Sequence, residues 1–419
     1  MGNRTAIGLT RQSRVILIWM CVLISVNQLG FGSVVPIIAL YAETFGVSQT
    51  AIGLTIAIYG LARFLINVPA GHLADVFGRR ITLAIGGATT VVGTVLCAVA
   101  PDYTTFLVAR FIAGAGAAAV LTGGQIVLAD ISAPHNRGRV MAIYQGVFLF
   151  SVGAGALPGG LLASRFGLAS PFWANAALAA VVTTIAWFAV PETRGLRSQR
   201  PASGTPLPTA SSPGNSQRPS FVAQLRSLAA TDGFLLVCLV SFTAFFARTG
   251  ALFNVIPLLA KSEIGLAPDQ IGIGLAMVSL VGLLLSYPSG AMVDRFGRKA
   301  VIVPATILSG IGMVFFGAAG TYTSFLVACA VWSSASGISS AAPAAYAADI
   351  APAGMTAATL GMYRMIADFG YVAGPLALGM LADVYSPQTA LVVTAILLVA
   401  SGVAFALRAP ETLQSAPAT

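Results

Sequence analysis

Long apolar runs recur along the whole chain, each close to the roughly 20 residues that a helix needs to cross a bilayer. Clear examples are residues 15–40, 82–100, 172–190, 234–246 and 391–407. Of the 419 residues, 57% are hydrophobic and only 8% are charged, whereas about 25% of the residues of a soluble domain are charged. No soluble fold can bury so much apolar surface. The sequence therefore predicts an all-α membrane protein with about twelve transmembrane helices.

The basic residues mark one side of these predicted helices. If the N-terminus is cytoplasmic, sixteen of the 22 Lys and Arg residues fall in inner loops and tails, and only Arg165 and Lys261 fall in outer loops. This asymmetry follows the positive-inside rule and predicts a multi-pass protein of the cytoplasmic (inner) membrane with both termini in the cytoplasm. It also accounts for the net charge of +9, so we expect the lipid bilayer as a partner and no nucleic acid.

The sequence contains one unit twice. An offset of 219 residues places the first half on the second from Gly46 to Thr193. The matched pairs include Gly46 with Gly265, Asp75 with Asp294, Gly78 with Gly297, Asp130 with Asp349, and Pro191-Glu192-Thr193 with Pro410-Glu411-Thr412. Chance does not keep one register over such a length. A polar stretch rich in Pro, Ser and Gly separates the copies. We expect an N-terminal six-helix bundle at 1–193, a cytoplasmic linker at 194–228 and a C-terminal six-helix bundle at 229–419.

A glycine-rich, charged loop follows the second and the eighth predicted helices. Glycines permit a tight turn between closely packed helices, and the Asp can lie against a helix N-terminus. The two copies comprise Gly71, Asp75, Gly78, Arg79 and Arg80, and Gly290, Asp294, Gly297, Arg298 and Lys299. Asp130 and Asp349 occupy repeat-equivalent positions from which they can pair with Arg79 or Arg80 and with Arg298. We expect these residues to form cytoplasmic gating motifs, although one copy alone would also suit a simple charged turn.

This loop closely resembles the signature loop of the major facilitator superfamily. Further resemblance to its twelve-helix drug:proton antiporters lies in Arg110, Gly114 and Gly116, and in Gly361, Gly370 and Gly374-Pro375. The fifth-helix copy of the last motif departs from the family pattern at Ala156, and a packing role of the glycines explains both copies equally well. The resemblance implies two pseudo-symmetric six-helix bundles, alternating access and transport of a small-molecule substrate with protons.

Five ionisable residues lie deep within the predicted spans. Charges near the bilayer centre are costly and often functional. Asp368 lies roughly 17 Å along its helix and is the only acid at such depth. With Arg364 four residues earlier, it forms either a self-neutralising pair or a carboxylate that binds and releases protons as its partners change. Because helices 2 and 11 face each other in the superfamily, Arg63 is an alternative partner for Asp368. We predict Asp368 and Arg364 as the proton-coupling residues.

The other embedded charges are arginines, so the set carries a surplus of positive charge. A guanidinium suits a carboxylate or phosphate, which predicts an anionic or zwitterionic solute. The alternative is that Arg63 or Arg110 reaches an interface or a backbone carbonyl. Uncharged polar residues in the spans complete a predicted substrate cavity, although helix-to-helix hydrogen bonding explains any single one. The cavity set is Asn27, Arg63, Arg110, Gln125, Gln145, Arg248, Asn254 and Tyr363.

Several functional classes are disfavoured by the sequence. The four cysteines lie in separate spans without metal-ligand spacing, so no metal site is expected. There is no Gly-rich phosphate loop for ATP, and acids and His are too sparse for a catalytic constellation, so we expect neither a cofactor nor an enzyme. We predict a monomer that exports an amphipathic or anionic compound by proton antiport. The alternatives are proton-coupled uptake of an organic anion or metabolite, and a non-transporting receptor or scaffold.

Overall fold

The computed structural model describes residues 10–132, 137–193, 227–228, 230–339, 342–352 and 355–412, and every regular element within these ranges is helical. The first bundle comprises α1 (Arg11–Val34), α2 (Ile38–Glu43), α3 (Gln49–Phe77), α4 (Arg79–Ala98), α5 (Tyr103–Ile131), α6 (Arg137–Phe166) and α7 (Ser170–Phe188). The second comprises α10 (Phe234–Phe246), η1 (Ala247–Val255), α11 (Ile256–Ser262), α12 (Pro268–Phe296), α13 (Arg298–Gly317), α14 (Tyr322–Ile338), α15 (Ala342–Asp349), α16 (Thr356–Val384) and α17 (Pro387–Arg408).

Twelve helices in the described part are long and apolar enough to cross a membrane, which confirms the predicted number. One of them, Phe234–Ser262, joins α10, the π-helical η1 and α11. In the first span, α1 ends at Val34 and α2 starts at Ile38. The break is at Pro36, which has no backbone N–H to donate. The protein is therefore a multi-pass membrane protein, as its apolar runs predict.

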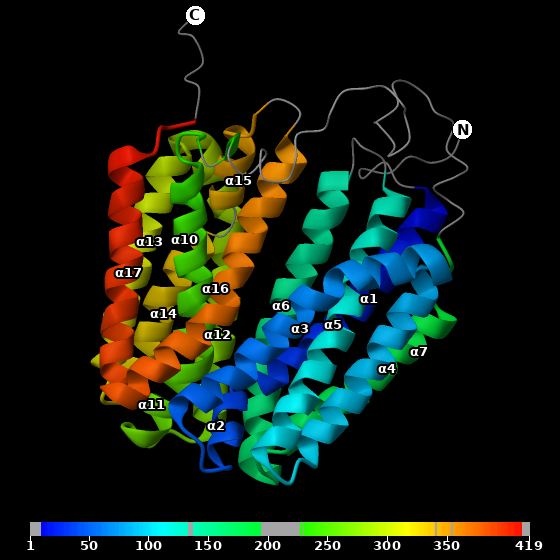
Figure 1. Ribbon diagram of the computed structural model, residues 1–419, viewed down its shortest axis with the longest axis horizontal. Coiled ribbons are helices and arrows are strands. Elements are labelled where there is room, and N and C mark those ends of the chain that lie inside the picture. The colour runs from blue at the N-terminus through cyan, green and yellow to red at the C-terminus, as the bar shows by residue number, and fades with distance from the viewer. Residues whose placement is uncertain are drawn as a thin grey trace, which may run out of the picture.

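The helices form two bundles that lie side by side (Figure 1). Within the first bundle α4 packs against α5 and α7, and within the second α13 packs against α14 and α17. The start of α1 and the end of α17 lie at one end of the molecule, here called the termini end, while α2 and α11 lie at the other, here called the far end (Figure 1). The two-bundle fold expected from the sequence repeat is confirmed.

Glycines at equivalent positions of the two repeats have similar backbone conformations. Gly46 and Gly265 have φ of 67° and 73°, and Gly78 and Gly297 have φ of 103° and 96°. Such positive φ values are readily adopted only by Gly. Gly78 and Gly297 additionally lack the space for a side chain, because an added Cβ would lie 2.3 Å from Glu192 Oε2 and 2.7 Å from Glu411 Oε2, respectively. The turns that join α3 to α4 and α12 to α13 therefore require glycine.

The two bundles contact each other mainly near the far end. The crossing pairs are α3 with α16 and α6 with α12. Their contacts fall in the far-end portions of these helices: Gly60 meets the ring of Tyr371, Gly153 meets Ser279, and Gly160 meets the backbone of Pro268. Toward the termini end the helices of the two bundles diverge (Figure 1). The conformation is thus closed at the far end.

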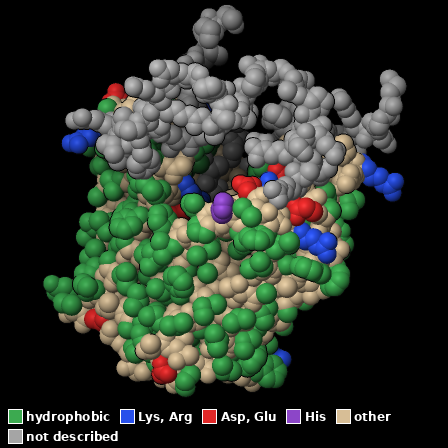
Figure 2. Space-filling model, turned by 45° about the vertical axis from the view of Figure 1, so that its right-hand side comes forward, with side chains coloured by type: hydrophobic (Ala, Val, Ile, Leu, Met, Phe, Trp, Pro, Cys, Tyr) green, Lys and Arg blue, Asp and Glu red, His purple; other side chains and the backbone are tan. Residues whose placement is uncertain are grey.

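Charged side chains gather near the termini end of the molecule. In Figure 2 they lie just below the grey residues, above a wide green and tan belt with few charges. Large apolar side chains such as Phe188, Val68 and Leu407 are each about four-fifths exposed. Because a soluble protein does not present so continuous an apolar surface, this belt is the surface that faces lipid.

Candidate functional site

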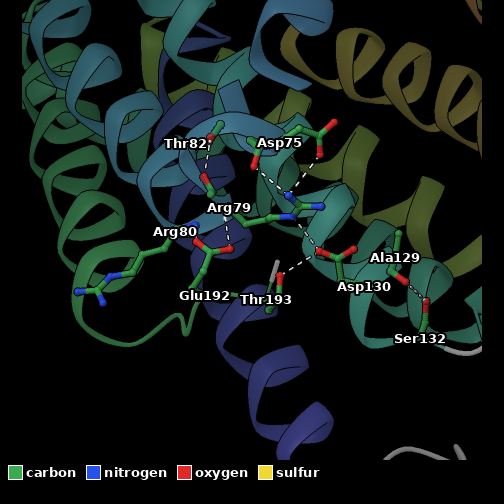
Figure 3. A network of polar contacts seen from close by, with 11 residues as sticks. Asp75, Arg79, Arg80, Thr82, Ala129, Asp130, Ser132, Glu192 and Thr193 are labelled. Atoms are coloured by element: carbon green, nitrogen blue, oxygen red, sulfur yellow. Dashed lines mark hydrogen bonds and ion pairs between the residues drawn. The ribbon is translucent and has the colours of Figure 1, made fainter. Parts of the chain in front are cut away.

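The loop motif of the first bundle forms a buried polar network (Figure 3). Arg79 starts α4, and its Nε lies 2.9 Å from the carboxylate of Asp130 near the end of α5. Its Nη1 donates to the carbonyl of Ala74 at 2.9 Å and lies 3.3 Å from Asp75. The hydroxyl of Thr193 donates to Asp130 at 3.1 Å. The predicted pairing of Arg79 with Asp130 is present, and it joins three helices and the end of the first bundle.

The second bundle repeats this network with more exposure to solvent. Arg298 Nε lies 2.8 Å from Asp349, and the hydroxyl of Thr412 donates to Asp349 at 3.1 Å. The side chains of Arg79 and Asp130 are 4% and 2% exposed, whereas those of Arg298 and Asp349 are 17% and 33% exposed. The first pair is buried because the ends of α3, α4 and α5 enclose it, whereas water reaches the second pair.

Two glutamates that sequence reasoning left without a role complete these networks. The carboxylate of Glu192 accepts the backbone N–H groups of Arg79 and Arg80 at 3.1 and 3.2 Å. Glu411 accepts those of Arg298 and Lys299, both at 3.0 Å. Each glutamate therefore caps the first turn of a helix, where unpaired N–H groups and the helix dipole favour an anion. The repetition of Pro-Glu-Thr at the offset of 219 was the sequence signal for this role.

Arg80 and Lys299 have different contacts from their neighbours. The guanidinium of Arg80 lies over the ring of Trp187 at 5.1 Å and points away from Asp130 (Figure 3). The Lys299 ammonium donates to the carbonyl of Ala409 at 2.8 Å. Of the two arginines proposed as partners of Asp130, the structure selects Arg79. Gly71 lies near Thr122, while the surroundings of Gly290 and the side chain of Asp294 lie outside the described part of the structure.

Because the Arg79 pair is buried and the Arg298 pair is partly exposed, we expect Arg79→Ala and Arg298→Ala to lower the free energy of unfolding by different amounts. Arg79→Ala leaves Asp130 charged and buried, so it should lower the free energy of unfolding by about 3–5 kcal/mol. Arg298→Ala should lower it by about 1–2 kcal/mol, because water can solvate Asp349. Thermal unfolding followed with a thiol-reactive dye measures this, since Cys97, Cys238 and Cys329 are free and buried. Equal losses of stability for the two variants would contradict the conclusion that burial makes the Arg79–Asp130 pair the more important of the two for stability.

Tyr371 lies on α16 near the point where the bundles meet, and three arginines lie in its neighbourhood. Tyr371 lies within electrostatic reach of Arg63, Arg110 and Arg248. The Arg110 Nε donates to the carbonyl of Thr55 at 3.2 Å, and its guanidinium lies 4.4 Å from the centre of the Tyr59 ring. The guanidinium of Arg63 lies 5.9 Å from the centre of the Tyr371 ring. Cation–π contacts of this kind hold an arginine in place without neutralising it.

None of these three arginines forms an ion pair with a carboxylate of the described residues. Arg110 is 3% exposed, and the Nε of Arg63 is buried without a hydrogen-bond partner. A buried charge without a counter-ion is costly. The arrangement is therefore electrostatically suited to receive an anion.

Two small cavities bring two of the arginines close to the same apolar residues. Arg110 and Tyr371 line one, Arg248 and Ser279 line the other, and Val35 and Phe253 line both. Arg248 lies in the nine-residue π-helical segment η1, a local geometry that is often found at functional sites. The cavity beside Arg110 has a volume of about 10 Å³ and the one beside Arg248 about 20 Å³, so each has room for about one water molecule at most. An organic ligand at this point therefore requires the bundles to move.

The predicted proton-coupling pair is formed on α16. Arg364 Nε lies 3.3 Å from Asp368, and the guanidinium also lies over the ring of Phe245 at 5.4 Å. The side chains of Arg364 and Asp368 are 58% and 36% exposed, so the carboxylate is accessible rather than enclosed. Tyr371 is within electrostatic reach of Asp368 as well as of the arginines. Arg63 forms no ion pair with Asp368 among the described residues.

The uncharged residues predicted for the cavity separate into different environments. Asn254 is completely buried and donates to the carbonyl of Pro375 at 3.3 Å, so it joins η1 to α16 and lines neither cavity. Asn27 is buried, while Gln125 and Gln145 are exposed. The hydroxyl of Tyr363 accepts a hydrogen bond from Ser241 at 2.8 Å. Tyr59, Tyr371 and Phe253, which contact the arginines, carried no signal in the sequence beyond being aromatic.

Comparison with known proteins agrees with this architecture. The family model described as the Major Facilitator Superfamily matches residues 20–260 and 237–419. An uncharacterised MFS-type transporter of Methanocaldococcus jannaschii is 23% identical over 377 residues, covering 89% of this chain and 92% of that protein. Multidrug resistance protein 2 of Bacillus subtilis is 22% identical over 316 residues, covering 74% of each chain.

Solved structures share the fold at lower identity. A D-xylose–proton symporter is 16% identical with a TM-score of 0.72, covering 94% of this chain and 98% of that one. The human organic anion transporter MFSD10 is 17% identical with a TM-score of 0.65, covering 94% and 99%. With the family model matched over both bundles, the twelve spans and the repeated loop networks have one explanation: the chain belongs to the Major Facilitator Superfamily, and it is a secondary transporter rather than an enzyme.

Proposed function

We propose that the protein exports a small amphipathic or anionic organic compound across the cytoplasmic membrane in exchange for protons. The bundles at 1–193 and 229–419, joined by a cytoplasmic linker at 194–228, act as one monomer. They rock against each other so that the central site opens alternately to the two sides of the membrane. The positive-inside rule assigns the termini end to the cytoplasm, so the conformation described above is open toward the cytoplasm.

The observation that carries the proposal is the uncompensated charge around Tyr371. Arg63, Arg110 and Arg248 bring three positive charges, while Asp368, the one acid among the described residues within electrostatic reach of Tyr371, is paired with Arg364. A cationic solute would be repelled from this site. An anionic group gains charge-assisted hydrogen bonds from guanidinium groups, and the neighbouring Val35 and Phe253 suit an apolar body.

Proton coupling is proposed through Asp368. A proton on its carboxylate removes the ion pair and frees Arg364 to approach another acceptor; loss of that proton restores the pair. The accessible position of the carboxylate supports exchange of protons with water in the open cavity. The resemblance of the helix 4 and helix 11 motifs to drug:proton antiporters, together with a relative named as a multidrug resistance protein, favours export.

Uptake is the second candidate, because the fold is shared with a D-xylose–proton symporter and the same arginines would bind an imported organic anion. A screen of organic anions and amphipathic compounds in everted vesicles, with a pH-sensitive dye inside, separates the two. Export by antiport predicts that an added substrate is concentrated in the vesicles while protons leave them. Uptake by symport predicts that substrate and protons leave together. No anion-dependent proton movement with any compound would contradict both.

The proposed orientation has its own test. A cysteine placed at Ser262, which is exposed at the far end, should react with a membrane-impermeant maleimide added to intact cells. A cysteine at Ser211, which lies outside the described residues, should react only after the cells are opened. The reverse pattern would show that the termini face outward.

A further inference from the structure

One carboxylate of the second bundle caps a helix of the first. Asp383, near the far end of α16, accepts the backbone N–H of Gln49 at 2.7 Å, the N–H of Thr50 at 2.8 Å and the hydroxyl of Thr50 at 2.5 Å. Gln49 is the first residue of α3, and its neighbour Ser48 accepts the N–H of Ala51 at 3.3 Å. The first N–H groups of a helix have no partner within it. Three of those in α3 are paired here, and two of the three donate to Asp383 of the other bundle.

This cap depends on a close crossing of α3 and α16. An added Cβ on Gly379, one turn before Asp383, would lie 2.5 Å from the carbonyl oxygen of Gln49, and one on Gly53 would lie 2.0 Å from that of Pro375. Two glycines thus let the helices approach until their backbones touch. A small separation of the bundles at the far end removes all three hydrogen bonds together.

The other contacts between the bundles at this end are of a different kind. Lys261 and Glu43 form an ion pair of 2.7 Å, but their side chains are 48% and 38% exposed, and exposed pairs contribute little. At the repeat-equivalent crossing of α6 and α12, Ser164 occupies the place of Asp383, and its hydroxyl donates to Leu161 in its own helix. The carboxylate cap is therefore present at one of the two crossings only.

We propose that Asp383 is the latch of the far end: its bonds to α3 stabilise the closed far end and set the balance between the two states of the transport cycle. The bonds exist when the far end is closed, and they must break before the far end can open. A contact made in one state alone shifts the equilibrium by its own free energy. This inference uses the membership of a family of alternating-access transporters and is independent of the proposed anion selectivity.

Double electron–electron resonance on the purified full chain tests the latch. One spin-label pair at Thr44 and Ser262 reports the far end, and a second pair at Phe77 and Phe296 reports the termini end. Asp383→Asn should increase the population with a long far-end distance and a short termini-end distance roughly tenfold, because the amide has one acceptor oxygen instead of two and loses the charge that strengthens the bonds to α3. Asp383→Glu, which keeps the charge, should retain more of the closed far end than Asp383→Asn.

Asp102→Asn is the matched control. Asp102 caps α5 through the N–H of Thr105 at 2.9 Å, but both residues belong to the first bundle. Its loss should leave both distance distributions unchanged. An Asp383→Asn distribution identical to that of the wild type, or an equal shift in Asp102→Asn, would overturn the proposal.

A second variant keeps the test decisive if Asp383→Asn does not fold. Gly379→Ala inserts a methyl group against Gln49 while leaving the carboxylate in place, so it should separate the helices and shift the populations in the same direction. The absence of any shift in a folded Gly379→Ala protein would count against the latch.

Discussion

Replacing Asp368 with Asn should abolish proton-driven accumulation of substrate in everted vesicles while substrate binding and downhill exchange are largely retained. The Asn amide has nearly the same shape as the Asp carboxylate, but it cannot take up and release a proton near neutral pH. It also loses the ion pair with Arg364, which is 3.3 Å away. Because both side chains are partly exposed, we expect the variant to fold. The loss of accumulation should be at least about tenfold, which corresponds to about 1.4 kcal/mol of coupling.

The control for this experiment is Glu263→Gln, which removes an exposed acid at the far end and should accumulate substrate as the wild type does. Proton release from the vesicles on addition of substrate is followed at the same time. Accumulation at the wild-type level by a well-expressed Asp368→Asn protein would assign Asp368 to a structural pair with Arg364. The coupling site would then be sought elsewhere.

Arg248→Ala should weaken the binding of an anionic substrate by about 10- to 100-fold. A hydrogen bond to a charged group contributes about 1.5–3 kcal/mol, and Arg248 lines one of the two central cavities without a carboxylate partner among the described residues. Arg248→Lys keeps the charge but loses the planar fork, so its affinity should lie between those of the wild type and the alanine variant. Titration calorimetry or a fluorescence binding assay in detergent measures the dissociation constants.

Arg408→Ala, at the exposed end of α17, is the control for loss of a positive charge, and its affinity should be unchanged. A neutral analogue of the substrate should bind Arg248→Ala and the wild type equally. If Arg248→Ala binds the anionic substrate with unchanged affinity, Arg248 does not bind its anionic group. Arg110 and Arg63 would then be the remaining candidates for that role. A stronger affinity would contradict an anionic substrate altogether.

Features that depend on spacing along the chain could be predicted from the sequence. The lengths of the apolar runs predicted the number of spans, and the offset of 219 predicted that Asp130 pairs with Arg79 or Arg80 and that Asp349 pairs with Arg298. Both are local or repeated patterns. The positive φ of Gly78 and Gly297 explains why these glycines recur in the two copies.

Features that depend on packing between helices could not be predicted. The sequence gives no reason for the pair in the first bundle to be buried and its equivalent to be partly exposed, since the same residue types form both. Asn254 was placed in the cavity by its polarity, but its side chain reaches Pro375. The partner of Asp383 lies more than 300 residues away in the chain, and no spacing rule connects it to the start of α3.

The order in which the first network is synthesised has a consequence for biogenesis. Glu192 and Thr193 bond to Arg79, Arg80 and Asp130, and these three partners precede them in the chain. When the ribosome has added Thr193, the residues of this network already exist, and no residue of the second bundle has been made. Since domains fold as units during synthesis, the first bundle can assemble in the bilayer while translation of its copy is still under way.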